Sequence, residues 1–261
     1  MSRRRRKKTR NKRLAIIFLI LLSVAAGYYF RQDIISLFEK HRQKPQTYKN
    51  FKNQLNKYSV FGIDVSEYQK EVDWKTVLKK QEIDFVIMRA TAGKNNKDDQ
   101  FNTNWKALEN TDVIRGAYHY YRPNENSEIQ AKFYIKHVKL SNGDLPPILD
   151  IEKYSKVQSI NSLKSGLLNW LKIVEKHYGV TPILYTYNNF YVTTIKNDHR
   201  FDRYPVWIAW YNVNEDPNTV LTDWVFWQFT DKGLLDGIEG NVDINVFNGK
   251  KQDLNGLRVI E

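Results

Sequence analysis

The chain has 261 residues, no cysteine and a formal net charge of +12. This length suits one large domain, and the absence of cysteine excludes disulfides, a thiol nucleophile and a cysteine-based metal site. Residues 1–13 carry +9 and residues 31–58 carry +5, which leaves −2 for residues 59–261. A nucleic-acid-binding domain carries its positive charge on the folded part, so the distribution excludes this class.

Residues 14–30, LAIIFLILLSVAAGYYF, carry no charge and predict a transmembrane anchor. As a helix, they are just long enough to cross a hydrocarbon core of roughly 30 Å. The basic residues 1–13 would stay cytoplasmic, which places the rest of the chain outside the cell. The alternative is secretion after signal-peptide cleavage near residues 24–26, but the apolar stretch is longer than a typical signal sequence. The polar residues 31–58 are interpreted as a partly helical stalk or linker.

Residues 59–261 alternate between strand-like and helix-like patterns, which predicts an α/β fold with a parallel sheet. The expected strands are 60–65, 84–91, 113–120, 146–151, 181–187, 205–210, 224–229 and 242–247. The expected helices are 73–81, 127–139 and 161–178. Eight strands in about 200 residues fit an irregular (β/α) TIM-like barrel with three final strands joined by loops too short for full helices.

Polar and aromatic residues gather where the expected strands end, and the chemistry of such barrels sits at the carboxyl ends of the strands. The acids are Asp64, Asp150, Glu152 and Asp243. The accompanying candidates for substrate binding are Tyr118, Tyr120, Tyr185, Trp207, Trp210 and Gln228. Flat aromatic faces of this kind suit the stacking of sugar rings.

Asp150 and Glu152, in the stretch PPILDIEKY, are separated by one residue at the end of an apolar run. Positions i and i+2 of a strand share a face, so both acids are predicted to face the barrel mouth while Ile151 faces the helix layer. Two such close acids cannot ionise independently, because the charge on one raises the pKa of the other. A protonated carboxyl beside an ionised one is what glycosidic cleavage requires.

Two other interpretations of this acid pair are solvated loop acids and a metal site. A hard cation would need more oxygen ligands and a glycine-containing loop, which the sequence lacks. We therefore expect neither a metal nor a cofactor.

Five blocks of sequence resemble glycoside hydrolase family 25, the lysozymes that act as N-acetylmuramidases. These blocks are FGIDVSEYQKEVDW (61–74), GAYHYYRP (116–123), PPILDIE (146–152), YPVWIAWY (204–211) and WVFWQFTDKGLLDGIEGNVDINVF (224–247). They occur in the family's order and cover about residues 60–250. The resemblance implies an irregular barrel of five β/α units plus further strands, and hydrolysis of the β-1,4 bond from N-acetylmuramic acid to N-acetylglucosamine in peptidoglycan.

The resemblance also implies roles for individual residues. Glu152 resembles the family's proton donor and Asp150 its partner carboxylate. Asp64 and Asp243 resemble two further site acids, and the sugar contacts would be Tyr118, Tyr120, Tyr185 and Trp207. One departure is Ala92, which stands where the family motif K/R-A-T-E-G has its glutamate, and this puts a peripheral contact in doubt.

Three interpretations of function follow for an extracellular domain expected to be monomeric. The first is a muramidase that acts on peptidoglycan glycan strands, and the five blocks together favour it. The second is a non-catalytic wall-binding module, but such a module would be expected to lack one of the four acids. The third is a chitinase-type hydrolase, because an Asp-x-Glu pair on a barrel strand also occurs there.

Overall fold

The structure is a computed structural model and describes residues 44–215, 217–219, 221 and 223–259. The expected anchor at 14–30 and the first part of the expected stalk, 31–43, lie outside these residues. Within the described part of the chain, no helix is long and apolar enough to cross a membrane.

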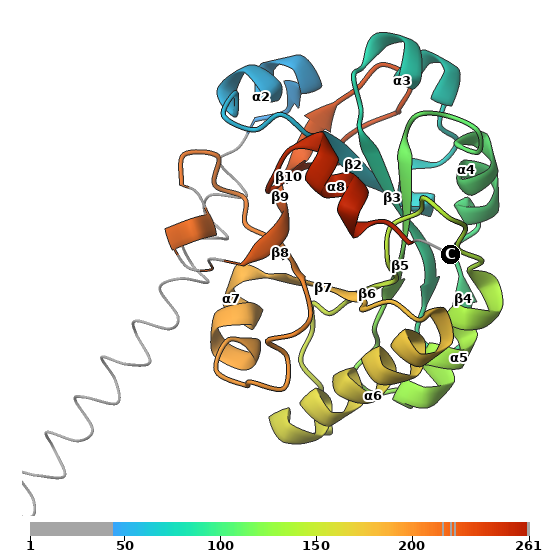
Figure 1. Cartoon of the computed structure of the whole chain (residues 1–261), viewed down its shortest axis with the longest axis vertical. Helices are drawn as coiled ribbons and strands as arrows, with labels where there is room; N and C mark the ends of the chain where they lie inside the picture. The colour runs from blue at the N-terminus through green and yellow to red at the C-terminus, as the bar shows by residue number, and fades with distance from the viewer. Residues whose placement is uncertain (1–43, 216, 220, 222, 260–261) are drawn as a thin grey trace, which may run out of the picture. The chain divides into compact units, whose positions relative to one another are not determined.

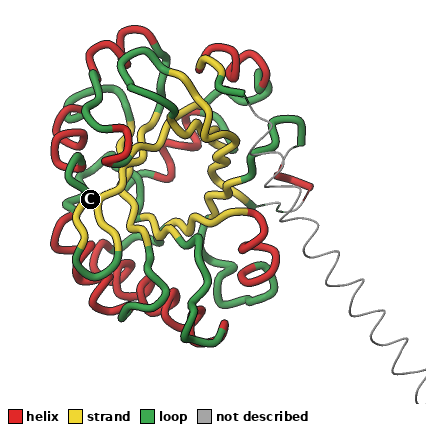
Figure 2. The backbone as a smooth tube through the Cα atoms, turned by 180° about the vertical axis from the view of Figure 1, so that it is seen from behind, coloured by secondary structure: helices red, strands yellow, loops and turns green. Residues whose placement is uncertain are grey.

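Eight strands form a closed ring with helices on the outside, as Figures 1 and 2 show. In chain order they are β2 (Phe61–Val65), β3 (Phe85–Ala92), β5 (Ile114–Tyr120), β6 (Ile148–Asp150), β7 (Ile183–Tyr187), β8 (Val206–Ala209), β9 (Trp224–Leu234) and β10 (Val242–Phe247). Neighbours in this order are hydrogen-bonded, and β10 pairs with β2 to close the ring. The expected barrel is therefore confirmed.

The remaining elements lie around this barrel. The helices are α2 (Tyr48–Gln54), α3 (Trp74–Lys80), α4 (Phe101–Ala107), α5 (Ser127–His137), α6 (Ile160–Tyr178), α7 (Asn188–Phe190) and α8 (Lys251–Leu257). Two short strands, β1 (Gln46–Thr47) and β4 (Asn96–Lys97), and the helical turns η1 (Glu67–Gln69), η2 (Tyr191–Ile195) and η3 (Pro217–Thr219) complete the described elements. The three predicted helices correspond to α3, α5 and α6, whereas α2, α4, α7 and α8 were not predicted.

Helix α6 shows how the sequence specifies an element. It begins after Ser159, whose side chain accepts a hydrogen bond from the backbone N–H of Ser162. It ends at Gly179, which adopts φ +71°, a left-handed conformation that favours glycine. Between these caps lies one apolar face, and its buried residues are Leu163, Leu167, Leu168, Trp170, Leu171 and Val174. That face packs the helix against the outside of the barrel.

Strand β10 corrects the expectation of a parallel sheet. It runs antiparallel to both β2 and β9, while the other neighbouring pairs of the ring are parallel. The connection from Leu234 to Val242 is too short for a parallel crossover, which needs a dozen residues or more. Consequently the start of β10, rather than its end, lies at the carboxyl ends of the parallel strands.

Two hydrophobic clusters follow from the alternation of side chains along the strands. The larger lies between strands and helices and includes Ile63, Leu149 and Trp170. The smaller includes Phe85, Ile148 and Phe226 inside the barrel, together with Leu254 of α8. Helix α8 thus contributes to the barrel interior at the end opposite the carboxyl ends of the parallel strands (Figure 1).

The segment that precedes the barrel differs from the expected linker. Within 31–58, β1 pairs in parallel with the end of β9, and α2 buries Tyr48 and Phe51. The ring of Phe51 packs edge-on against Phe229 of β9, with ring centroids 5.5 Å apart. These aromatic contacts tie residues 46–55 to the barrel, so this part of the expected stalk belongs to the folded domain.

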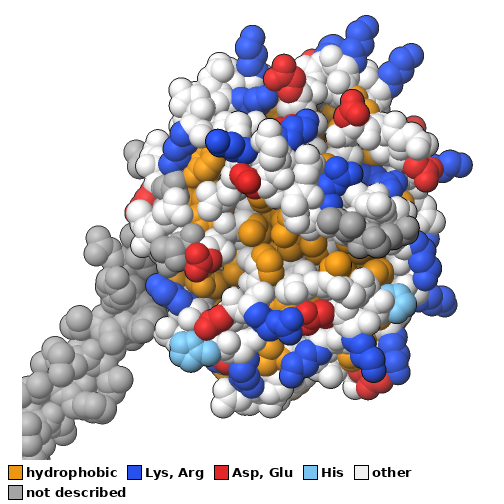
Figure 3. Space-filling model, viewed as in Figure 1, with side chains coloured by type: hydrophobic (Ala, Val, Ile, Leu, Met, Phe, Trp, Pro, Cys, Tyr) orange, Lys and Arg blue, Asp and Glu red, His pale blue; other side chains and the backbone are white. Residues whose placement is uncertain are grey.

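Charges on the folded domain are mixed. On the face shown in Figure 3, lysine and arginine side chains are spread around the margin with acids among them, and apolar side chains lie nearer the middle. Several of the lysines are paired with acids, for example Lys80 with Asp236 and Lys251 with Asp84. This distribution agrees with the near-neutral charge of residues 59–261.

Candidate active site

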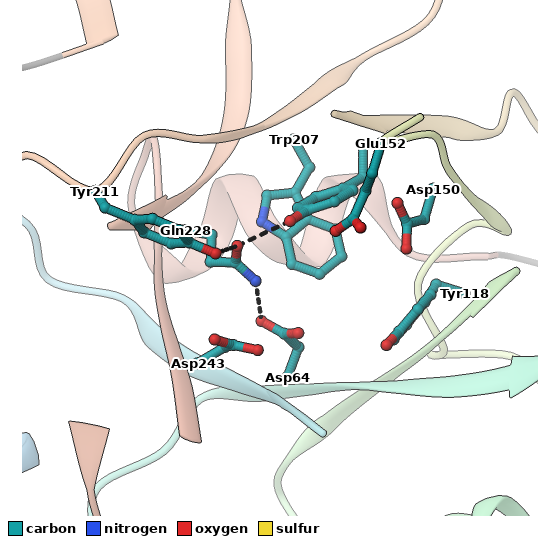
Figure 4. Close-up of a pocket in the computed structure, with 9 residues that line it drawn as sticks. Asp64, Tyr118, Asp150, Glu152, Trp207, Tyr211, Gln228 and Asp243 are labelled. Carbon is teal, nitrogen blue, oxygen red and sulfur yellow. Dashed lines mark hydrogen bonds between the residues drawn. The ribbon is translucent and has the colours of Figure 1, made fainter. Parts of the chain in front are cut away.

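A pocket opens inside the barrel where the parallel strands end (Figure 4). It is lined by Asp64, Tyr118, Asp150, Glu152, Tyr185, Trp207, Tyr211, Gln228 and Asp243. The cavity volume is about 80 Å³, enough for several water molecules or for part of one sugar ring. The four acids predicted from the sequence therefore meet in one place.

Asp64 and Asp243 face each other directly across the β2–β10 pair. They are register partners in the antiparallel ladder, so their side chains leave the sheet on the same face. Two ionised carboxylates directly opposite each other repel, so this pairing favours protonation of one of the two acids. Only the antiparallel direction of β10 brings Asp243 to this mouth.

Asp150 and Glu152 both line the pocket, as their spacing predicts. Ile151 between them is fully buried on the other side, in the core between strands and helices. Strand β6 ends at Asp150, but the chain stays in place because Ile151 N–H donates to the Tyr185 carbonyl. Thr186 Oγ1 also donates to the Ile151 carbonyl at 2.6 Å. These tethers hold Glu152 in the strand-like position that its spacing requires.

Asp150 is the acid with the least satisfied carboxyl. Its side chain is buried, and among the described residues its Oδ1 has no hydrogen-bond partner. Burial, followed by the nearby Glu152 and Asp64 carboxylates, raises the pKa of Asp150 well above its usual value. A buried oxygen without a donor costs free energy, so this atom is an acceptor available to a ligand.

Asp64 is held in the opposite way. Its Oδ2 accepts hydrogen bonds from Gln228 Nε2 at 2.9 Å and from Asn245 Nδ2 at 2.8 Å. Burial raises the pKa of Asp64 to about 6, although the two amide hydrogen bonds act to lower it. Asn245 was not predicted, and its only signal in the sequence is its place two residues after Asp243.

Three of the expected aromatic residues line the pocket. Tyr185 and Trp207 pack edge to face with ring centroids 4.5 Å apart, and Tyr118 approaches Trp207 at 6.5 Å. Trp207 is almost fully buried, and its indole N–H donates to Asn245 Oδ1 at 2.8 Å. Burial and this hydrogen bond therefore hold the Trp207 side chain in the wall of the pocket.

Two expected residues are not among those that line the pocket. Trp210 packs in the core between strands and helices, and Tyr120 is half-buried with Lys153 Nζ 5.7 Å from its ring centroid. Tyr211 lines the pocket instead and was missed. The period of two along the strand explains why Tyr211 replaces Trp210, since Trp207 and Tyr211 share the inner face and Trp210 points outward.

Gln228 connects several side chains of the site. Its Oε1 accepts the hydroxyl hydrogens of Tyr185 and Tyr211, both at 2.9 Å, while its Nε2 donates to Asp64 (Figure 4). Gln228, which was expected to contact the substrate, is thus hydrogen-bonded to three neighbouring side chains.

The departure at Ala92 lies outside the pocket lining. Ala92 is buried at the end of β3, where it pairs with Asn96 of β4.

Among the described residues, no group of three or more histidine, aspartate or glutamate side chains is arranged to hold a metal ion. The pocket lining consists of carboxyl and aromatic side chains and the amide of Gln228.

Comparisons with known proteins point to one family. The model of the family described as "Glycosyl hydrolases family 25" matches residues 63–238. "Lysozyme M1" of Streptomyces globisporus is 32% identical over 210 residues, which covers 76% of this chain and 71% of that protein. "Uncharacterized protein YegX" of Escherichia coli O6:H1 is 38% identical over 204 residues, which covers 77% of this chain and 74% of that protein.

A solved structure agrees with these relatives. The family 25 glycosyl hydrolase from Bacillus anthracis superposes with a TM-score of 0.70 at 30% identity, covering 82% of this chain and 97% of that one.

Proposed function

From the premise that this chain belongs to glycosyl hydrolase family 25 and is a glycoside hydrolase, we propose that it cleaves peptidoglycan as a muramidase. The bond cleaved is the β-1,4 bond from N-acetylmuramic acid to N-acetylglucosamine. Glu152 acts as the acid and base, and Asp150 is its partner carboxylate. Asp64 and Asp243 complete the acidic part of the site.

The observation that carries this proposal is the Asp150 carboxyl beside Glu152. Asp150 Oδ1 is buried in the pocket wall without a described donor, and Glu152 lines the same cavity. A sugar with a 2-acetamido group supplies an N–H donor of the kind that this oxygen lacks. The substrate itself then satisfies an acceptor that the folded chain leaves open.

The chemistry follows from these two carboxyls. Glu152 gives its proton to the leaving oxygen while the acetamido carbonyl oxygen attacks the anomeric carbon, so one C–O bond forms as the glycosidic C–O bond breaks. Asp150 accepts the amide N–H and stabilises the positive charge that develops on that group. Water then attacks the anomeric carbon, Glu152 takes a proton from it, and the acetamido group is restored. This substrate-assisted route retains configuration.

The stereochemistry of the first product tests this route. NMR of the products formed in the first turnovers should show the β-anomer. An inverted product would indicate that the anomeric carbon is attacked by a water activated by Asp150 instead of by the acetamido group. Trapping of a covalent Asp150 adduct would identify Asp150 as the nucleophile.

The variant Glu152→Gln tests the assignment of the acid. It should digest purified cell wall about 10²–10⁴-fold more slowly, because the amide cannot supply the proton. A zymogram followed by mass analysis of the released muropeptides measures this loss. The matched control is Glu109→Gln, which changes an exposed glutamate near the end of α4 and should keep the wild-type rate. Wild-type digestion by Glu152→Gln would end the assignment.

Substrate class is tested by comparing peptidoglycan with chitin. We expect reducing ends to be released from peptidoglycan, whereas preferential release from chitin would indicate a chitinase-type enzyme. A wall-binding protein without activity would retain binding and release nothing from either polymer.

The location proposed for this activity is the outer face of the cell membrane. The support is the uncharged stretch 14–30 behind nine basic residues at 1–13, which orients the domain away from the cytoplasm. A tethered hydrolase acts on the wall within reach of its anchor, so we propose that it remodels the wall of the cell that makes it. Cleavage as a signal peptide would instead release the domain.

A further inference from the structure

The Asp64 carboxylate lies in a clamp formed by two side-chain amides from neighbouring strands. Gln228 of β9 and Asn245 of β10 both donate to Asp64 Oδ2, at 2.9 and 2.8 Å. Both amide side chains are buried, as is Asp64 itself. Two donors on one carboxylate oxygen favour the ionised form of the acid.

The orientation of the Asn245 amide is settled by its other neighbour. Trp207 Nε1 lies 2.8 Å from Asn245 Oδ1, and an indole nitrogen only donates. The amide oxygen must therefore face Trp207, which turns the NH₂ group toward Asp64.

Gln228 is oriented by two donors in the same way. The hydroxyls of Tyr185 and Tyr211 both donate to its Oε1, so its NH₂ group also faces Asp64. The aromatic wall of the pocket thus determines what the two amides present to the acid.

We propose that Asn245 and Gln228 are positioning residues that keep Asp64 an ionised hydrogen-bond acceptor at neutral pH, with Trp207, Tyr185 and Tyr211 fixing their orientation. The inference rests on the proposed function for its catalytic meaning. Cleavage of a glycosidic bond develops positive charge on the sugar ring, and a fixed negative charge in the pocket wall stabilises it. The clamp supplies that charge without movement during the reaction.

The surroundings of Asp64 make such a clamp necessary. The groups that interact with it through their charge are Asp150, Glu152, Tyr118, Tyr185 and Tyr211, and its register partner Asp243 faces it. Arg89 of β3 acts on Tyr118 and Asp150. The surrounding groups that can ionise are thus mostly acids, and each acid that ionises raises the pKa of the acids beside it. Burial already raises the pKa of Asp64 to about 6, so loss of either amide donor would move it further toward the neutral form.

The variant Asn245→Asp tests the clamp through the pH profile. One oxygen of the new carboxyl accepts the Trp207 N–H, and the other faces Asp64 and donates only while it is protonated. In the wild type the amide donates at every pH. The kcat/KM of the full chain on solubilised peptidoglycan should therefore stay within a few-fold of wild type near pH 5. By pH 8 it should fall by at least about tenfold, because two coupled acids cannot both ionise freely.

The chain offers a matched control. Asn104 of α4 is also buried and also accepts an indole N–H, from Trp74 Nε1 at 3.0 Å, but it is not among the pocket-lining residues. Asn104→Asp should shift the whole profile by a constant factor at most. A profile of Asn245→Asp that runs parallel to the wild-type profile would overturn the proposal.

A second measurement does not depend on activity. Asn245→Leu and Asn104→Leu each leave one indole N–H without its acceptor, so both should lower the melting temperature. The penalty of Asn245→Leu should grow between pH 4 and pH 8, since it also removes a donor from ionising Asp64, while that of Asn104→Leu should stay constant. Equal pH dependence of the two penalties would refute the clamp. If the wild type failed to digest peptidoglycan, the proposed function would fall, and this comparison would still decide the clamp.

Discussion

Asp150 shows at the scale of one residue how a catalytic requirement opposes stability. Its side chain is buried among acids, and its Oδ1 has no partner among the described residues. A hydrogen-bond donor at this position would stabilise the fold but would occupy the oxygen that the proposed mechanism reserves for substrate. Strained or unsatisfied groups of this kind are typical of active sites.

The variant Asp150→Asn should therefore be more stable than the wild type and much less active. The pKa of Asp150 is raised in the folded chain, so its ionisation weakens the fold as pH rises from the unfolded value through the folded one. The gain in melting temperature should be smallest near pH 4 and largest at neutral pH. Thermal unfolding across this range measures it.

The control for this prediction is Asp112→Asn, which changes an exposed acid. Its effect on the melting temperature should be small at every pH. A gain for Asp150→Asn that did not vary with pH would contradict the explanation by ionisation.

At the scale of elements, β10 contributes more to the site than any sequence pattern suggested. Its antiparallel direction brings Asp243 opposite Asp64, and two residues later Asn245 reaches the same carboxylate. A hairpin from β9 is sufficient to reverse the chain here, whereas a parallel strand would have required a helix-length crossover. The irregular end of the barrel is thus the part that completes the acidic site.

Two glycines near helix ends should respond in opposite ways when each is replaced by alanine, one substitution lowering the stability of the domain and the other raising it. Gly179 ends α6 with φ +71°, whereas Gly256 lies in α8 without a positive φ, and a Cβ at either would meet no described atom within 4 Å. Gly179→Ala should destabilise the domain by about 1 kcal/mol, because alanine disfavours the left-handed conformation. Gly256→Ala should stabilise it by up to about 1 kcal/mol through helix propensity.

Denaturant titration of the two variants measures both effects in the same assay. Because neither substitution makes new contacts, shifts of the same sign would mean that backbone conformation is not what distinguishes these positions.

At the scale of the whole molecule, the folded domain starts earlier than the composition suggested. Residues 46–55 pair with β9 and pack on it, so the chain passes from the expected anchor to the barrel through fewer than twenty residues (31–45). A short connection of this kind would keep the domain close to a membrane that held residues 14–30.

Cell fractionation tests the proposed anchor. The full chain should remain with membranes after extraction at high pH, because an apolar helix resists it, and removal of residues 1–30 should release an active soluble enzyme. Protein found in the medium with an N-terminus near residue 27 would show that the segment is a cleaved signal peptide.

The sequence alone determined the eight strands, the longest helices and the acid pair, because these depend on periods that are local to the chain. Asp150 and Glu152 share a face as a consequence of the strand period alone, and both line the pocket. The same period would have selected Tyr211 instead of Trp210, had it been applied beyond the end of the strand.

Only the tertiary structure decided how distant residues satisfy one another. Asp64 and Asn245 are 181 residues apart, and no local pattern indicates that an asparagine held by Trp207 donates to that acid. The direction of β10 and the docking of α2 on β9 are likewise outcomes of chain closure and packing. Hydrogen-bond partners are specified by position in space, and that position exists only once the barrel has closed.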